Sequence, residues 1–200
     1  MEDNDDLTEL IEQLSDEDDE VRTSAISALV EIGEPAIPPL IEALGDVIWD
    51  VCDGAADALA RIGEPATPAL IEALNDTERH HALNVGDALA RIGEPALPAL
   101  IDALNDTYQP VREHAMRALS SIGEPAKVAL PALISGLHDA DTEVRAYAAF
   151  ALAKIGQSAS DAVPALIEAL ADVSERVRQH AMLALNQIGT PEAKKALSQL

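Results

Sequence analysis

Residues 51–76 read VCDGAADALARIGEPATPALIEALND, and residues 81–106 read HALNVGDALARIGEPALPALIDALND. The two segments are identical at 18 of 26 positions, which identifies an internal repeat with a period of 30 residues. One glycine of this repeat recurs along the chain, at spacings of 30 residues and later of 33: Gly33, Gly63, Gly93, Gly123, Gly156 and Gly189. The repeat therefore extends over nearly the whole sequence.

Each repeat has the pattern of two short helices. In the first repeat the apolar residues recur with a helical period rather than with the alternation of a strand: Val21, Ala25, Ala28, Leu29 and Ile32. Gly33 follows where a chain leaves a helix through a left-handed turn, and the proline at position 35 then favours the start of a second helix. The three extra residues of the later repeats fall after the glycine, where we expect a loop to accommodate them.

A single pair of such helices has no partner for its apolar stripe, whereas stacked copies bury their stripes against one another. We therefore predict an all-α fold, a right-handed α-α superhelix of about six two-helix repeats preceded by an N-terminal half repeat. The prediction treats residues 1–200 as one repeat domain with these parts: a capping helix at 7–16, and repeats near 18–46, 48–76, 78–106, 108–139, 141–172 and 174–200.

The composition restricts the classes of function. Acidic side chains outnumber basic ones by 36 to 13, and the resulting net charge of −23 repels nucleic acids and anionic membrane surfaces. Cys52 is the only cysteine, which excludes an internal disulfide and any metal site that needs several thiolates. We expect a soluble, cytoplasmic and monomeric protein that binds no nucleic acid and no membrane.

Two short motifs resemble those of HEAT repeats, specifically the short HEAT-like repeats of phycobilin lyases. The motifs are VRxxAxxALxxIG in the first helix and PALIEAL in the second, and the resemblance covers residues 7–200. It implies a solenoid whose second helices line the concave face and whose first helices line the convex face. It also implies that the arginine after the first-helix valine meets the aspartate that closes the preceding helix.

The repeats do not all keep this arginine. Four of them have it: Arg22, Arg112, Arg145 and Arg178. The aspartates that precede these arginines are Asp16, Asp106, Asp139 and Asp172. In the second and third repeats Cys52 and Ala82 replace the arginine, which leaves Asp46 and Asp76 without that local counter-charge.

The sequence contains no motif of a nucleophilic enzyme, no phosphate-binding loop and no dinucleotide fingerprint. We therefore expect no catalytic residue, no cofactor and no metal. Two of the histidines, His114 and His180, share one repeat position, and we interpret them as solvated or partly packed helix residues.

One group of residues has the types that bind a metal. His80 and His81 lie one repeat after Asp50, Cys52 and Asp53, and together these side chains suit Zn²⁺ or copper if adjacent repeats bring them close. The alternative is that they are surface positions that have drifted, because sequence spacing does not fix distances between helices.

The second helices carry acidic residues at one repeat position, here called the acidic ridge. Its members are Glu12, Glu42, Glu72 and Asp102, the first four steps; the fifth step is Ser135 and the sixth is Glu168. Three interpretations stay open: a solvated helix face, a groove for a basic segment of a partner protein, and adaptation to high salt.

The two most similar repeats differ mainly at one edge. Six of the eight differences between residues 51–76 and 81–106 fall in the first six residues of the first helix. The loops that precede these helices also differ, and one of them contains Trp49, the only tryptophan. Because drift alone would spread changes over every exposed position, we interpret this edge as a specific contact. Alternatively, the Trp49 ring packs into the space beside the small Ala56.

We therefore expect a non-catalytic scaffold or adaptor that binds a protein partner, with an acidic groove for a basic partner segment. The residues expected to contact the partner are Trp49, Ile48, Arg79, His80, Tyr108, Glu42, Glu72 and Asp102. The family resemblance implies an alternative, a bilin lyase-like subunit that handles an open-chain tetrapyrrole for attachment to a biliprotein. A metal-dependent enzyme that uses His80, His81 and Cys52 is a third interpretation.

Overall fold

A computed structural model describes residues 2–75 and 79–200, with side chains for residues 6–75 and 80–200. All regular structure within these residues is helical and no strand occurs there, which confirms the predicted all-α repeat fold. The α-helices (α) and 3₁₀ turns (η) are, in chain order, α1 (Glu2–Glu12), η1 (Gln13–Ser15), α2 (Asp19–Ile32), η2 (Glu34–Ala36), α3 (Ile37–Ala43), α4 (Trp49–Ile62), η3 (Glu64–Ala66), α5 (Thr67–Ala73), α6 (Arg79–Ile92), η4 (Glu94–Ala96), α7 (Leu97–Ala103), α8 (Gln109–Ile122), η5 (Glu124–Ala129), α9 (Leu130–Gly136), α10 (Thr142–Ile155), η6 (Gly156–Ala162), α11 (Val163–Ala169), α12 (Glu175–Ile188) and α13 (Pro191–Leu197). In this described part of the chain, no helix is both long and apolar enough to span a membrane.

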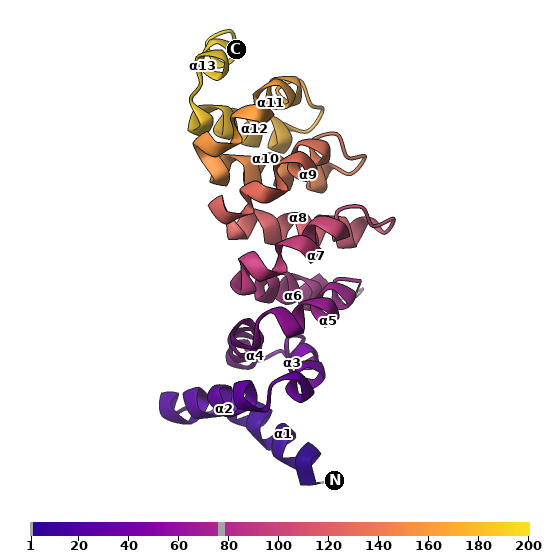
Figure 1. Ribbon diagram of the computed structural model, residues 1–200, viewed down its shortest axis with the longest axis vertical. Coiled ribbons are helices and arrows are strands. Elements are labelled where there is room, and N and C mark those ends of the chain that lie inside the picture. Colours follow the sequence, from indigo (N-terminus) through magenta and orange to yellow (C-terminus); the bar gives the residue numbers. More distant parts are fainter. Residues whose placement is uncertain (1, 76–78) are drawn as a thin grey trace. The chain divides into compact units, whose positions relative to one another are not determined.

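The chain divides into two compact units, residues 1–99 and residues 100–200, and the division falls within α7. In the first unit α4 packs between α2 and α6, while the shorter helix α3 contacts α5. In the second unit α10 packs between α8 and α12 in the same way, and α11 contacts α13. Figure 1 shows how a 14-residue helix and a 7-residue helix alternate within each unit.

The recurring glycine ends each long helix with a positive φ, between 64° and 79°. In five of the six glycines this φ is combined with a ψ between −131° and −135°, a region that only glycine populates readily. The backbone at these five glycines is therefore not left-handed helical, and the predicted left-handed turn is wrong there. Gly189 alone is left-handed helical. The 3₁₀ turn between the two helices has three residues in η2, six in η5 and seven in η6, so the extra residues of the later repeats lengthen this turn, as the sequence predicts.

Leucine forms the innermost layer of each unit. Each of the first five repeats buries one leucine from its long helix and one from its short helix with 0% exposure: Leu29 and Leu40, Leu59 and Leu70, Leu89 and Leu100, Leu119 and Leu133, Leu152 and Leu166. Complete burial of a leucine side chain contributes about 1.5–3 kcal/mol to folding. The positions that hold the repeats together therefore lie between the two layers of helices, and the outer edges of the long helices are left to vary.

In the second unit an arginine of the long helix joins neighbouring repeats. Arg112 donates to the Asp139 carboxylate from Nε at 2.9 Å and from Nη2 at 3.1 Å, and Arg145 binds Asp172 in the same bidentate way. Each of these two arginines pairs with the aspartate at the end of its own repeat, so the implied meeting with the preceding aspartate does not involve that residue's carboxylate.

The carboxylate of the preceding aspartate makes a hydrogen bond within its own loop. Its Oδ1 accepts a hydrogen bond from the amide two residues further on, as from Tyr108 to Asp106 at 2.7 Å. The arginine binds the main-chain oxygen of that aspartate instead, at 3.0 Å from Arg112 to Asp106. The guanidinium thus bridges the loop before its own helix and the loop before the next one.

This arginine contact predicts a pH-dependent contribution to stability. The Arg145 guanidinium, by donating hydrogen bonds to Asp172, lowers the pKa of that carboxyl below its ordinary value. A carboxyl whose folded-state pKa is lowered adds stability above its unfolded pKa of about 3.9, and the contribution is lost as the pH falls through the folded value. Both side chains are only 12% exposed, so solvent screens the contact weakly.

We therefore expect Asp172→Asn to lower the free energy of unfolding at pH 7 by about 2 kcal/mol, measured by urea denaturation. The difference between the variant and the wild type should shrink as the pH falls below about 4. Asp46→Asn is the matched control, because Asp46 accepts the same loop hydrogen bond, from the Ile48 amide at 2.8 Å. Among the described side chains no basic group pairs with Asp46, so Asp46→Asn should cost much less. Equal losses in the two variants would contradict the assigned role of the arginine.

Candidate partner-binding site

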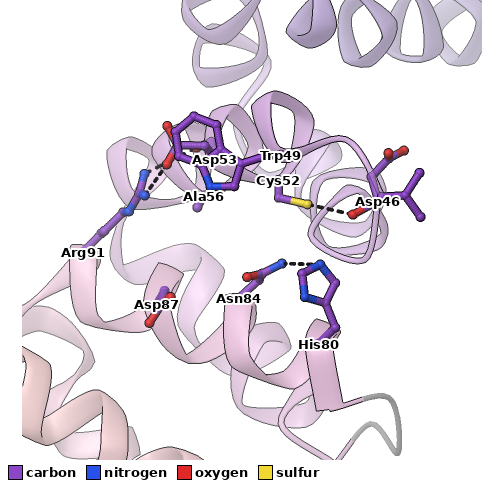
Figure 2. A pocket seen from close by; sticks show the side chains of 10 residues that line it. Asp46, Trp49, Cys52, Asp53, Ala56, His80, Asn84, Asp87 and Arg91 are labelled. Carbon is purple, nitrogen blue, oxygen red and sulfur yellow. Dashed lines mark hydrogen bonds and ion pairs between the residues drawn. The ribbon is translucent and has the colours of Figure 1, made fainter.

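A pocket opens in the first unit between α4 and α6, the long helices of the second and third repeats. Its volume is about 170 Å³. The pocket is lined by Asp46, Val47, Trp49, Cys52, Asp53, Ala56, His80, Asn84, Asp87 and Arg91. Figure 2 shows Trp49, Cys52 and Asp53 on the α4 side of the space, and His80, Asn84 and Asp87 on the α6 side. This is the edge at which the two most similar repeats differ in sequence.

The pocket exists because α4 has small side chains where other long helices have large ones. Cys52 stands where the fourth repeat has Arg112, and Ala56 stands where that repeat has Met116. In the fourth repeat Met116 is buried and the Arg112 side chain extends to Asp139. Removing this volume from one helix without a compensating change leaves space beside it.

The Cys52 thiol takes over one hydrogen bond of the missing arginine. Its Sγ donates to the main-chain oxygen of Asp46 at 3.0 Å. In four other repeats the guanidinium donates to the oxygen at the same position, six residues earlier in the chain: Asp16, Asp106, Asp139 and Asp172. Burial, followed by the nearby Asp46 charge, raises the pKa of the thiol, so Cys52 is a protonated donor rather than a thiolate nucleophile.

Polar contacts tie the α6 side of the pocket to α4 and to the end of α3. Asn84 donates from Nδ2 to the Leu44 main-chain oxygen at 2.7 Å, and the same nitrogen lies 3.4 Å from His80 Nε2. Arg91 forms an ion pair with the Asp53 carboxylate and also donates to the Asp53 main-chain oxygen at 3.3 Å. The Arg91–Asp53 contact joins α6 directly to α4 and so limits the width of the pocket.

Three consecutive apolar residues form an exposed rim beside the pocket. Val47 is 97% exposed, Ile48 is 47% exposed and Trp49 is 71% exposed. Of the two interpretations of Trp49, the structure therefore excludes packing in the core. Trp49 is also the first residue of α4, so the ring is carried by a helical turn rather than by a loop.

The other residues predicted to bind a partner lie in several places. His80 lines the pocket, whereas Arg79 begins α6 with a side chain that lies outside the described residues. Glu42 on α3 and Glu72 on α5 are exposed side chains of the first unit. Asp102 and Tyr108 belong to the second unit, where both are exposed.

Three pocket residues escaped the sequence analysis: Asn84, Asp87 and Arg91. Together with His80 they occupy positions 80, 84, 87 and 91, which form one face of a helix. The α4 residues at 49, 52, 53 and 56 form a second such face. The helical spacing of these residues can be read from the sequence. Which face of each helix turns toward a neighbouring helix is decided by packing, which the sequence pattern does not give.

The histidines and the metal-binding hypothesis can be assessed on the described residues. Within these residues no group of three or more His, Cys, Asp or Glu side chains is arranged to hold a metal ion. His81 lies with Nε2 2.8 Å from the Ile41 main-chain oxygen. His114 is 5% exposed and therefore buried, not solvated, because α8 packs directly against α10. His180 is half-buried, with Nδ1 2.9 Å from the Ala146 main-chain oxygen.

The net charge is concentrated in the unit that carries the pocket. Residues 1–99 contain 24 acidic and 4 basic side chains, a net charge of −20. Residues 100–200 contain 12 acidic and 9 basic side chains, a net charge of −3. The pocket itself is lined by three aspartates against one arginine. A cationic ligand is therefore attracted to the first unit and, within it, to the pocket.

Comparison with known proteins adds to this description. A family model described as HEAT repeats matches residues 7–81, 67–131 and 130–200. No curated protein matches the sequence. Among solved structures, the complex of CpcE and CpcF of phycocyanin lyase from Nostoc sp. PCC7120 matches at 28% identity and a TM-score of 0.56, over 75% of this chain and 98% of that chain. A designed armadillo repeat protein in complex with the peptide (KR)4 matches at 24% identity and a TM-score of 0.52, over 91% and 99%, a similarity of fold alone.

The exposed position of Trp49 predicts a simple spectroscopic result. Because Trp49 is the only tryptophan, the emission of the free protein should be red-shifted, as for an indole in water. Trp49→Ala should change the free energy of unfolding by no more than about 0.5 kcal/mol, since surface substitutions rarely cost more. Leu59→Ala, at a fully buried position of the same helix, should cost about 2–5 kcal/mol. A blue-shifted emission in the free protein would show that the ring is buried in solution.

Proposed function

This chain belongs to the HEAT-repeat family, and we propose that it is a non-catalytic scaffold or adaptor that binds a protein partner through the first unit. One observation carries the proposal: Val47, Ile48 and Trp49 form an exposed apolar rim next to a polar pocket. Exposed apolar residues that lie side by side at the rim of a pocket are typical of interaction sites, whereas scattered ones are not. Tryptophan is also among the residue types that most often dominate the binding energy of interfaces.

The rim is held on a rigid support. One face of α4 is buried, with Val51, Ala55 and Leu59 in the core between α2 and α6. When a partner covers Trp49, few loop residues of this chain have to become ordered, and the entropic cost of binding is reduced.

The charge of the first unit supports a partner with a basic segment. Glu42 and Glu72 occupy one repeat position on α3 and α5, two helices that contact each other, and both side chains are exposed. The net charge of −20 on residues 1–99 raises the local concentration of cationic segments and accelerates their association. We propose that the apolar rim gives the contact its specificity and that the acidic ridge speeds the encounter.

A second candidate function rests on the similarity to the CpcE–CpcF complex of phycocyanin lyase at 28% identity. It would make this chain a bilin lyase-like subunit that handles an open-chain tetrapyrrole. The acidic surface is poorly suited to bilin propionates, because both carry negative charge. Adding a bilin to the purified protein separates the two functions. We expect an unchanged bilin absorption spectrum, and a shifted spectrum that saturates at one bilin per chain would favour the lyase-like function.

The partner itself can be captured from a native lysate on immobilised protein and identified by mass spectrometry. Trp49→Ala should then weaken its binding roughly thirtyfold, because losing a hot-spot side chain costs on the order of 2 kcal/mol. Val173→Ala is a control on the second unit: Val173 follows Asp172 as Val47 follows Asp46, and it is 91% exposed where Val47 is 97% exposed. This control should bind with unchanged affinity.

The electrostatic part of the proposal has its own readout. Raising the salt concentration should slow association more than it changes dissociation, as should replacing Glu42 and Glu72 by glutamine. A partner whose binding ignores both Trp49→Ala and salt would contradict the proposed function of this surface.

A further inference from the structure

In other repeats an arginine occupies the position that Cys52 has in the second repeat, and its contacts show which group the fold binds there. Three of these arginines, in the second unit, donate from one nitrogen to two successive main-chain oxygens of the preceding loop. The oxygens belong to Asp106 and Thr107 for Arg112, to Asp139 and Ala140 for Arg145, and to Asp172 and Val173 for Arg178, at distances of 2.7–3.3 Å. The fold thus builds a recurring acceptor pair for a guanidinium.

In the second repeat the corresponding loop residues are Asp46 and Val47, and both line the pocket. Cys52 is too short to replace the guanidinium, and its thiol reaches the Asp46 oxygen only. The third repeat also lacks the arginine and has the buried Ala82 in its place, but the loop before its long helix lies outside the described residues. Within the described residues, the second repeat therefore has a pocket beside the position that an internal guanidinium occupies in other repeats.

We propose that this pocket binds the guanidinium group of an arginine side chain supplied by the basic segment of the protein partner. The inference rests on the proposed function and adds the chemical identity of the group that enters the pocket. A guanidinium offers five N–H donors in a plane. Asp46, Asp53 and Asp87 line the pocket, and the exposed Trp49 ring at its edge can stack on a cation. The main-chain oxygen of Asp46 accepts from the Cys52 thiol and has a second lone pair for a guanidinium donor.

Arginine fits this pocket better than lysine does. The acceptors lie around the space in fixed directions, from a loop, from α4 and from α6, and a planar fork with several donors can reach more than one of them. A lysine ammonium is more strongly hydrated and must lose that water in a pocket this small. Arg91 already neutralises Asp53, but the three aspartates still outnumber this single arginine.

Trp49 makes the test direct, because the only tryptophan lines the pocket and reports on its occupancy. The probe is N-acetyl-arginine amide, titrated into the full chain at constant ionic strength while the fluorescence is recorded. We expect saturable binding with a dissociation constant on the order of 1 mM, as befits a ligand of this size. N-acetyl-lysine amide carries the same charge and should bind at least about fivefold more weakly. N-acetyl-citrulline amide has a similar shape without the charge and should not bind.

Two substitutions close the pocket in ways that other repeats already use. Cys52→Arg restores the internal guanidinium, and Ala56→Met introduces the residue that the fourth repeat has at this position. Each should reduce the affinity for the arginine probe at least tenfold, and Cys52→Arg should melt no lower than the wild type. Ser24→Arg is the matched control, because it adds the same charge to an exposed position on α2 in the same unit. This control should bind the probe like the wild type.

If the arginine and lysine probes bind equally and Cys52→Arg behaves like Ser24→Arg, the attraction is only that of an acidic surface and the proposal is overturned. If the arginine probe shows no saturable binding to the wild type, the proposal is also overturned, because the pocket then does not bind a guanidinium. The proposed function is tested separately with the captured partner. A partner that responds to Trp49→Ala but not to Cys52→Arg would leave the scaffold in place and refute the arginine pocket alone.

Discussion

The structure depends on one constraint: each pair of helices must bury its apolar stripe against the pair beside it. The fully buried leucines, one from each helix in the first five repeats, satisfy this constraint at the same place every time. The glycine with positive φ and the 3₁₀ turn after it set the angle at which the short helix returns to the long one. Because these inner positions are fixed, the residues that can vary without loss of the fold are those on the outer edge of the long helices and in the loops before them.

The two units use this freedom differently. In the second unit, bidentate contacts from Arg112 and Arg145 tie each loop to the next, and its acidic and basic side chains nearly balance. In the first unit, the second and third repeats lack the arginine and the net charge reaches −20. The first unit thus gives up an inter-repeat contact of the kind that stabilises the second and gains an open pocket with an exposed tryptophan at its rim. We infer that this exchange adapts the first unit for binding.

The two-helix repeat and the position of the lengthened turn could be predicted from sequence, because apolar periodicity and the recurring glycine reflect local geometry. The partner of Arg112 could not. The preceding and following aspartates are both available in sequence, and only the packing of α8 against α10 decides that the side chain reaches Asp139. The exposure of Trp49 could not be predicted for a similar reason. Space exists beside Ala56, but Trp49 is the first residue of α4 and its ring points away from the core. Asn84, Asp87 and Arg91 were missed because their helix face acquires a function only when α4 lies opposite.

The central claim is that the outer edge of α4 and α6 is a binding surface and not a drifted solvent-exposed edge. Hydrogen–deuterium exchange of the full chain, alone and in complex with the captured partner, tests it most directly. We expect slower amide exchange in the complex for residues 46–56 and 80–91, and unchanged exchange for residues 172–187, which hold the equivalent positions of the sixth repeat. Slower exchange only in the second unit, with residues 46–56 unchanged, would contradict the claim.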